Sequence, residues 1–356
     1  MSEKRENKKQ LFLDACRFQP VERVPVWIMR QAGRYLPEYQ AVRAKRSFLE
    51  ICKTPELTAE VSLQPFHALG VDAIVVFSDI LIVAEAMGMP LDVPDSGPLL
   101  SNPVRNGANV QRLRDFDPEH ETRFVGDAIR AICKEVGPDV PVIGFAGAPW
   151  TLACYMIEGR TRGDISRALG MLREEPATVR DLLERIARAT AAYLNSQIAA
   201  GAAAVQLFDT WAGELSVEEY DAFELPATQT IFEALSSEGV PRILFGKGSA
   251  RHLASMSQSG AEVLSVDWQT DLADARRVLG RRVALQGNVE PAILLDDEEG
   301  IRHAVREAIA KTGGEGHILN LGHGILPGTP VENARAFVNE GQKALQSARA
   351  QAGKTD

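Results

Sequence analysis

Two arginines stand four residues apart directly after an apolar run, in the stretch VPVWIMRQAGR. If the chain turns helical after Met29, this spacing places the guanidiniums of Arg30 and Arg34 on one side of the turn. A guanidinium binds a carboxylate through two parallel hydrogen bonds, so the pair is suited to a ligand with more than one carboxylate. The alternative is a solvated helix face, and the local sequence favours neither.

A lone carboxylate, Asp79, ends a second apolar run, VDAIVVFSD. An ionised carboxylate has lone pairs for about four donors, so Asp79 could accept several N–H groups of a ligand. Asp79 and its neighbour Ser78 are equally suited to capping the helix that follows. Both interpretations stay open at this point.

Three more residues carry groups that take part in proton transfer or covalent chemistry. In GFAGAPWTLACYMIEG we expect Thr151 to cap a helix and Tyr155 to lie one turn into it, where it either packs or meets a ligand. In NLGHGILP, His323 stands between two glycines, which would let a ligand approach the backbone, and imidazole relays protons near neutral pH. Lys247, after RILFG, could form a Schiff base or bind an anion.

A repeating pattern positions these residues: a helical segment ends in glycine, and a short apolar run follows. Glycine supplies the left-handed residue after a helix, and uniformly apolar runs are typical of parallel strands covered on both faces. The eight runs lie in VPVWIM, VDAIVVF, PDVPVIGFA, AAAVQLFD, VPRILFGK, AEVLSVDW, RRVALQGN and GEGHILNLGH. This alternation predicts a single-domain α/β fold, a (β/α)8 TIM barrel. A doubly wound open sheet is the alternative, but no GxGxxG follows the first run.

Active sites of such barrels lie at the C-terminal ends of the strands. The residues that follow the runs should therefore form one ring: Arg30, Arg34, Ser78, Asp79, Gly147, Pro149, Asp209, Thr210, Lys247, Asp267, Trp268, Asn288 and His323. The segment from about 88 to 119 is too long for a plain connection and is predicted to cover this ring. Residues 1–8 and 348–356 are predicted to be disordered ends of the single domain 1–356.

Composition limits the partners. The chain of 356 residues carries a net charge of −9, so we expect neither nucleic acid nor an anionic membrane to bind it, and an anionic ligand needs local arginines. The four cysteines show no CxxC or Cys/His spacing, which argues against disulfides and structural zinc and suits the cytoplasm. The charged N-terminus and the absence of a long apolar stretch argue against a secretory signal and a membrane span.

Two long stretches, PVWIMRQAGRYLPEY and GFAGAPWTLACYMIEG, resemble the signature motifs of the uroporphyrinogen decarboxylase family, and FSDIL, QLFDTWAG, ALQGNVEP and NLGHGILP follow in the family's order. The resemblance covers essentially the whole chain. It implies a homodimer, without metal or organic cofactor, that converts uroporphyrinogen III to coproporphyrinogen III and four CO2 in haem synthesis. It also implies that Arg30 and Arg34 bind substrate carboxylates, that Asp79 binds the pyrrole N–H groups, and that Tyr155, Phe208, Thr210 and His323 line the cleft. Many relatives carry serine at Thr210 and histidine at Trp211, so a general role for the second position is in doubt.

The residue types suit this reaction. Loss of CO2 from an acetate on a pyrrole leaves an electron pair, and protonation of the adjacent ring carbon provides the sink. A fixed carboxylate at Asp79 would stabilise the resulting cation. The expected catalytic residues are Asp79, Arg30, Tyr155 and His323, with the proton donor left open.

Two other functions are carried as alternatives. A barrel methyltransferase would need a zinc site of cysteine and histidine at the strand ends, where Cys154 is the only nearby cysteine. A non-catalytic tetrapyrrole-binding protein would keep the cleft without the activity, and the intact Arg30, Arg34, Asp79 and Tyr155 speak against it.

Overall fold

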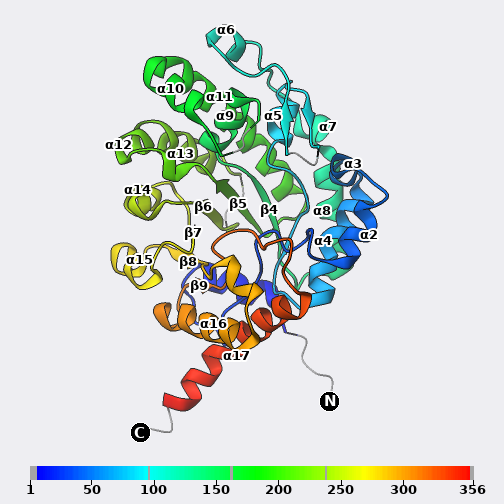
Figure 1. Cartoon of the computed structure of the whole chain (residues 1–356), viewed down its shortest axis with the longest axis vertical. Helices are drawn as coiled ribbons and strands as arrows, with labels where there is room; N and C mark the ends of the chain where they lie inside the picture. Colours follow the sequence, from blue (N-terminus) through cyan, green and yellow to red (C-terminus); the bar gives the residue numbers. More distant parts are fainter. Residues whose placement is uncertain (1–5, 95–96, 161–162, 237–238, 353–356) are drawn as a thin grey trace.

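A parallel sheet of seven strands forms the centre of the molecule. The computed structural model describes residues 6–94, 97–160, 163–236 and 239–352. Along the sheet the strands are β1 (Ile74–Val75), β4 (Val142–Gly147), β5 (Ala204–Asp209), β6 (Arg242–Gly246), β7 (Val263–Val266), β8 (Ala284–Gln286) and β9 (His317–Ile318). Strands that follow one another in the sequence are neighbours here, and all pairs are parallel. Figure 1 shows helices surrounding this sheet.

The first apolar run closes the sheet into a barrel. Val26 forms a parallel bridge with Leu319, just beyond β9, and the N–H of Leu319 donates to Pro25 O at 2.9 Å. On the other side the N–H of Asp72, just before β1, donates to Val26 O at 2.7 Å. The apolar run VPVWIM therefore lies between β9 and β1 and takes the place of the eighth barrel strand. The predicted single-domain (β/α)8 barrel is confirmed, and the open sheet is wrong.

Helices connect the strands and cover the barrel. The longer ones are α1 (Lys8–Cys16), α4 (Pro55–Leu69), α8 (Arg123–Val136), α9 (Pro149–Glu158), α10 (Ser166–Glu174), α11 (Pro176–Ala199), α13 (Leu225–Glu233), α15 (Leu272–Leu279), α16 (Glu298–Thr312) and α17 (Val331–Ala352). Shorter ones are α2 (Pro37–Arg43), α3 (Phe48–Lys53), α5 (Ile82–Ala86), α12 (Val217–Glu219) and α14 (Leu253–Met256), with η1 (Ala212–Glu214), η2 (Tyr220–Glu224), η3 (Ala250–His252) and η4 (Pro291–Leu295). Gly70 ends α4 with a φ of 76°, as the glycine pattern predicts.

The long segment between α5 and α8 has its own short elements. It contains the antiparallel pair β2 (Leu91–Asp92) and β3 (Leu99–Leu100), followed by α6 (Gly107–Val110) and α7 (Pro118–Glu121). The N–H groups of Leu100 and Val104 donate to Gly159 O and Met156 O at 2.7 and 2.8 Å. These bonds fasten the segment to the C-terminal end of α9.

The two ends of the chain lie on the same side of the molecule in Figure 1. Of the ends predicted to be disordered, residues 1–5 and 353–356 lie outside the described residues. In the described remainder, Glu6 pairs with Arg23, helix α1 starts at Lys8 and helix α17 continues to Ala352.

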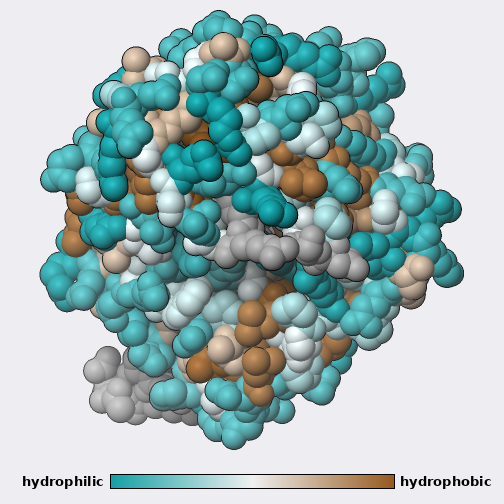
Figure 2. Space-filling model, turned by 45° about the horizontal axis from the view of Figure 1, so that its top comes forward, coloured by the Kyte–Doolittle hydropathy of each residue, from teal (hydrophilic) through white to brown (hydrophobic). Residues whose placement is uncertain are grey.

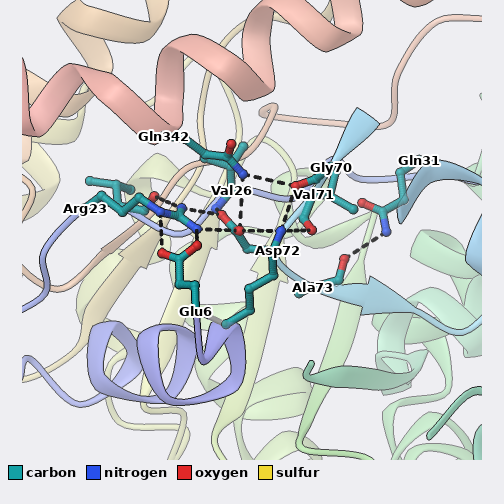
Figure 3. A network of polar contacts seen from close by, with 11 residues as sticks. Glu6, Arg23, Val26, Gln31, Gly70, Val71, Asp72, Ala73 and Gln342 are labelled. Atoms are coloured by element: carbon teal, nitrogen blue, oxygen red, sulfur yellow. Dashed lines mark hydrogen bonds and ion pairs between the residues drawn. The ribbon is translucent and has the colours of Figure 1, made fainter. Parts of the chain in front are cut away.

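A buried ion-pair network lies at the N-terminal ends of the first strands (Figure 3). Arg23 donates two hydrogen bonds of 2.7 Å to Asp72, one to each oxygen, and two of 2.8 Å to Glu6. The carboxylate of Asp72 also accepts from the N–H of Val26 at 2.9 Å and from Gln342 at 3.2 Å. The network therefore connects the VPVWIM segment, which closes the barrel, to β1 and α17.

Apolar side chains are concentrated inside. Among the described residues, the large hydrophobic side chains left exposed are those of Leu99, Val278 and Leu295. The face in Figure 2 is largely hydrophilic, and its hydrophobic side chains form separate patches. No described helix combines the length and the apolar character needed to cross a membrane.

Candidate active site

A cavity of about 1000 Å³ opens at the C-terminal ends of the strands. Of the predicted ring, Arg30, Arg34, Ser78, Asp79, Thr210 and His323 line it, as do Tyr155 and Phe208. The other ring members, Gly147, Pro149, Asp209, Lys247, Asp267, Trp268 and Asn288, are not part of the lining. Val93, Pro94, Gly97 and Pro98 of the 88–119 segment do contribute, so that segment borders the cavity. The barrel thus brings the seven predicted site residues to one place.

The two arginines reach the cavity by a different route from the one expected. The predicted helical turn after Met29 is wrong, because residues 30–36 form turns and α2 begins only at Pro37. Arg30 has a φ of 61°, in the left-handed region that non-glycine residues rarely adopt. Its side chain lies against Gly324, where even a methyl group would overlap it. Local backbone strain and this close approach therefore aim Arg30 at the cavity.

A third arginine, which the sequence patterns do not predict, borders the cavity. Arg43, the last residue of α2, lines the cavity and donates to Arg46 O at 2.9 Å. Its position follows from the placement of α2 beside the cavity, where Tyr39 and Gln40 also line it, and no local motif reveals this placement. Neither Arg30 nor Arg34 has a carboxylate within ion-pair distance in the described part of the chain. Asp79 is the one carboxylate among the described lining residues.

Asp79 serves a local bond and still faces the cavity. Its Oδ1 accepts the N–H of Leu81 at 2.7 Å, just before α5 begins at Ile82, so the capping interpretation is partly right. Burial raises the pKa of Asp79, while the hydrogen bond from Leu81 and the charge of Arg30 act in the opposite direction. Additional N–H donors or a cation from a ligand would favour its ionised form.

Aromatic rings form the inner wall. Phe208, on β5, packs edge-on against Phe145 of β4 with the ring centroids 5.5 Å apart, and its centroid is 5.9 Å from that of Phe245 on β6. Trp27 also lines the cavity, and its indole N–H donates to Gln286 Oε1 inside the barrel at 2.9 Å. These rings give the cavity an apolar wall.

His323 is neutral near pH 7. Burial, followed by the charges of Arg30 and Lys247, lowers the pKa of His323 to about 4. Its ring packs against Phe245, with centroids 5.9 Å apart. The flanking glycines were expected to let a ligand approach the backbone, but the structure gives another reason for glycine at these positions. A side chain at Gly322 would overlap the backbone of Trp268, and one at Gly324 would overlap the side chain of Arg30.

Thr151 does not cap α9 as predicted. The capping position is Ala148, which offers no side chain, and Thr151 lies inside the first turn. Its hydroxyl donates to Asp209 Oδ1 at 2.7 Å and accepts the N–H of Thr210 at 2.9 Å. The helix therefore contacts the end of β5 through Thr151, one turn before Tyr155.

Lys247 and Trp211 lie outside the cavity lining. Lys247 is exposed at the end of β6, so a Schiff-base role has no support from the cavity. Trp211 is half-buried beside the turn after β5. No group of three or more His, Cys, Asp or Glu residues in the described part of the chain could hold a metal ion.

Comparison with known proteins decides the family. The family model described as "Uroporphyrinogen decarboxylase (URO-D)" matches residues 7–344. The chain belongs to the uroporphyrinogen decarboxylase family. A uroporphyrinogen decarboxylase of Geobacter metallireducens is 49% identical over 325 residues, which cover 91% of this chain and 95% of the relative. One from Pelobacter propionicus is 49% identical over 338 residues, covering 94% and 99%.

Solved structures extend the likeness of the fold. A methyltransferase from Methanosarcina mazei superimposes with a TM-score of 0.80 at 24% identity, over 95% of this chain and 99% of that one. A B12-independent methionine synthase from Shewanella gives 0.58 at 11% identity, over 93% and 96%. At these identities the likeness concerns the fold, so the family is assigned by the decarboxylase relatives.

Proposed function

We propose that this chain decarboxylates the four acetate side chains of uroporphyrinogen III, giving coproporphyrinogen III and four CO2. The observation that carries the proposal is the family's barrel with a cavity whose described lining holds three arginines and one carboxylate. An acidic protein of net charge −9 binds a ligand with eight carboxylates only where positive charge is concentrated. The cavity lining has that concentration.

Arg30 and Arg34 bind carboxylates of the substrate, and Arg43 adds a third cation at the same mouth. Bidentate hydrogen bonds from a guanidinium are strong and orient the carboxylate. Phe208 and its aromatic neighbours pack against the macrocycle, and Thr210 supplies a hydroxyl beside them. Binding thus fixes the acetate groups relative to Asp79.

Asp79 accepts the pyrrole N–H groups at the centre of the macrocycle. Protonation of the ring carbon beside an acetate makes the ring cationic, and the C–C bond to the carboxylate then breaks, returning its electron pair to the ring and releasing CO2. This leaves an exocyclic methylene group, which takes up a proton while the ring carbon loses the one it gained. Each cycle therefore consumes one proton net and replaces an acetate by a methyl group. The carboxylate of Asp79 stabilises the cationic state, because opposite charges attract more strongly at a buried position than in water.

His323 and Tyr155 take different parts. With its pKa at about 4, His323 carries no extra proton at neutral pH and acts as an N–H donor to the substrate. Tyr155 lines the same cavity, and a phenol is a stronger acid than a guanidinium. We therefore assign proton delivery to Tyr155 and substrate binding to Arg30.

The family resemblance also supports three companion proposals: a homodimer, a cytoplasmic location, and a reaction without metal or organic cofactor. The four cysteines are free, as suits a reducing compartment. Light scattering of the purified protein tests the dimer, and a monomer at assay concentration would contradict it.

Purified protein should convert freshly reduced uroporphyrinogen, with chelator and no added cofactor, to products with seven, six, five and four carboxylates. Chromatography of the oxidised products by carboxylate number measures this. Binding of the porphyrinogen without any loss of carboxylate would support the non-catalytic alternative, and transfer of a methyl group would support the methyltransferase.

A further inference from the structure

Two buried carboxyl groups behind the cavity wall take no part in the chemistry above. Asp209 is the last residue of β5 and Glu224 the last of the π-helical turn η2, and their exposed fractions are 1% and 0%. In the described part of the chain neither has a lysine, arginine or histidine within ion-pair distance. Burying a carboxyl group without a cation is costly, so its retention calls for an explanation.

Both carboxyl groups bind the first turn of α9. Glu224 Oε2 accepts the N–H of Trp150 at 2.7 Å, and Asp209 Oδ1 accepts the hydroxyl of Thr151 at 2.7 Å. The N-capping residue Ala148 provides no side-chain acceptor. The two acids therefore take the place of the missing cap, and the positive end of the helix dipole favours them there.

The Thr151 hydroxyl joins this helix to the turn after β5. It accepts the N–H groups of Thr210 at 2.9 Å and Trp211 at 3.3 Å. A hydroxyl has one proton and two lone pairs. Because the proton goes to Asp209, the lone pairs are left to face these two N–H groups. Asp209 thus orients the Thr151 hydroxyl so that its lone pairs accept the two N–H groups of the turn after β5.

We propose that Thr151, oriented by Asp209, is a positioning residue for the decarboxylation. The turn that it holds carries Thr210, and the helix that it belongs to carries Tyr155 one turn later. Both side chains line the cavity from these two elements. A displacement of about 1 Å at a reacting group can reduce the rate about a hundredfold, so fixing one element against the other matters for turnover. This inference rests on the proposed function.

The test compares Thr151→Val, which has the same shape without the hydroxyl, with Thr151→Ser, which keeps it. On reduced uroporphyrinogen we expect Thr151→Val to lower kcat at least about tenfold, with KM within about threefold because the arginine anchors lie on another element. Thr151→Ser should restore kcat to within about threefold of the parent. This recovery and the split between kcat and KM are readouts that a merely structural role would not give.

Thr228→Val is the matched control. Thr228 is also fully buried and donates its hydroxyl to Glu224 Oε1 at 2.7 Å, but it holds no N–H of the cavity wall. It should lose stability to a similar extent and keep its kcat. Equal losses of kcat in Thr151→Val and Thr228→Val would overturn the proposal.

Thr151→Val leaves Asp209 buried without its donor and risks misfolding. The double variant Thr151→Val, Asp209→Leu also removes the carboxyl group, which is less costly than leaving it buried without its hydroxyl donor. A folded protein with parental kcat, in either the single or the double variant, would overturn the proposal. An inactive parent chain would instead refute the proposed function, so the two failures are distinguishable.

Discussion

The two ends of the barrel use the same residue types for opposite purposes. At the N-terminal end, the Asp72 carboxylate accepts two hydrogen bonds from Arg23 and others from Val26 and Gln342, and Lys8 lies 3.1 Å away (Figure 3). At the C-terminal mouth, the Asp79 carboxylate accepts one local N–H, from Leu81. The charges at the first end are satisfied by the protein itself, and those at the mouth are left for a ligand.

The pKa values follow this difference. Burial acts to raise the pKa of Asp72, but Arg23 and Lys8 outweigh it and lower that pKa. Burial raises the pKa of Asp79, because the opposing hydrogen bond and the charge of Arg30 are too weak to offset it. Paired charges therefore stabilise the fold at the N-terminal end. The mouth keeps a poorly paired carboxylate, whose ionised form is stabilised when a ligand brings a cation or N–H donors.

The largest effect is expected at the N-terminal end. Asp72→Asn breaks the buried pair and leaves Arg23 without its full partner, which should reduce the free energy of unfolding by about 3–5 kcal/mol. At temperatures where the variant is folded, kcat and KM should stay at the parental values. Urea unfolding and the decarboxylase assay measure the two quantities. Asp274→Asn, which breaks an exposed pair with Arg277, is the control and should change little.

The next effect is expected at the mouth. Arg34→Ala removes a charge-assisted bond to a substrate carboxylate, worth about 1.5–3 kcal/mol, so KM should rise by about tenfold to a hundredfold. Stability should change little, since Arg34 has no ion-pair partner among the described residues. Steady-state kinetics measures KM, with Arg277→Ala at an exposed position as the control. An unchanged KM in Arg34→Ala would contradict the proposal that Arg34 binds a substrate carboxylate.

A smaller effect should come from a single methyl group. Gly324→Ala would overlap the Arg30 side chain and displace it, so kcat/KM should fall about tenfold. Gly328→Ala, in the same loop, has no neighbour within 4 Å of the added methyl and should keep the parental kcat/KM. Equal kcat/KM in the two variants would show that the position of Arg30 is not critical.

The smallest effect is a change in how stability depends on pH. Burial raises the pKa of Asp209 to about 7, from 3.8 when unfolded. The folded state therefore holds a proton that the unfolded state loses, and this residue's contribution to stability falls as pH rises from about 4 to 7. Asp209→Asn should reduce the decline, while Glu224, whose pKa burial also raises, keeps its own contribution. Asp72, whose pKa is lowered, has the opposite sign: its contribution is lost as pH falls below about 4. Urea unfolding at several pH values measures both, and an unaltered decline in Asp209→Asn would contradict the assignment.

Sequence alone was enough for the barrel, and it predicted six of the strand-end residues that line the cavity. Strands buried on both faces have to be apolar throughout, and the residue after each run then lies on the catalytic face. The predicted helical turn at Arg30 and Arg34 is wrong, and a left-handed backbone with a close contact to Gly324, far away in the sequence, sets the direction of Arg30. Such contacts form only after closure of the barrel.

Arg43 and Thr151 show what local patterns leave out. Arg43 has the sequence context of a basic residue at the end of a surface helix. Only the placement of α2 beside the cavity brings Arg43 into its lining. Thr151 has the sequence context of a helix cap, yet its partner Asp209 lies 58 residues away. Both depend on tertiary neighbours that no spacing along the chain encodes.

The most direct test of the contrast between the two ends is the turnover of reduced uroporphyrinogen by the Asp79→Asn variant. If Asp79 is kept poorly paired for the substrate, kcat should fall by about a hundredfold to a thousandfold, as on removal of one group that stabilises transition-state charge, while the free energy of unfolding stays the same or rises. Parental kcat in a folded Asp79→Asn protein would contradict the account.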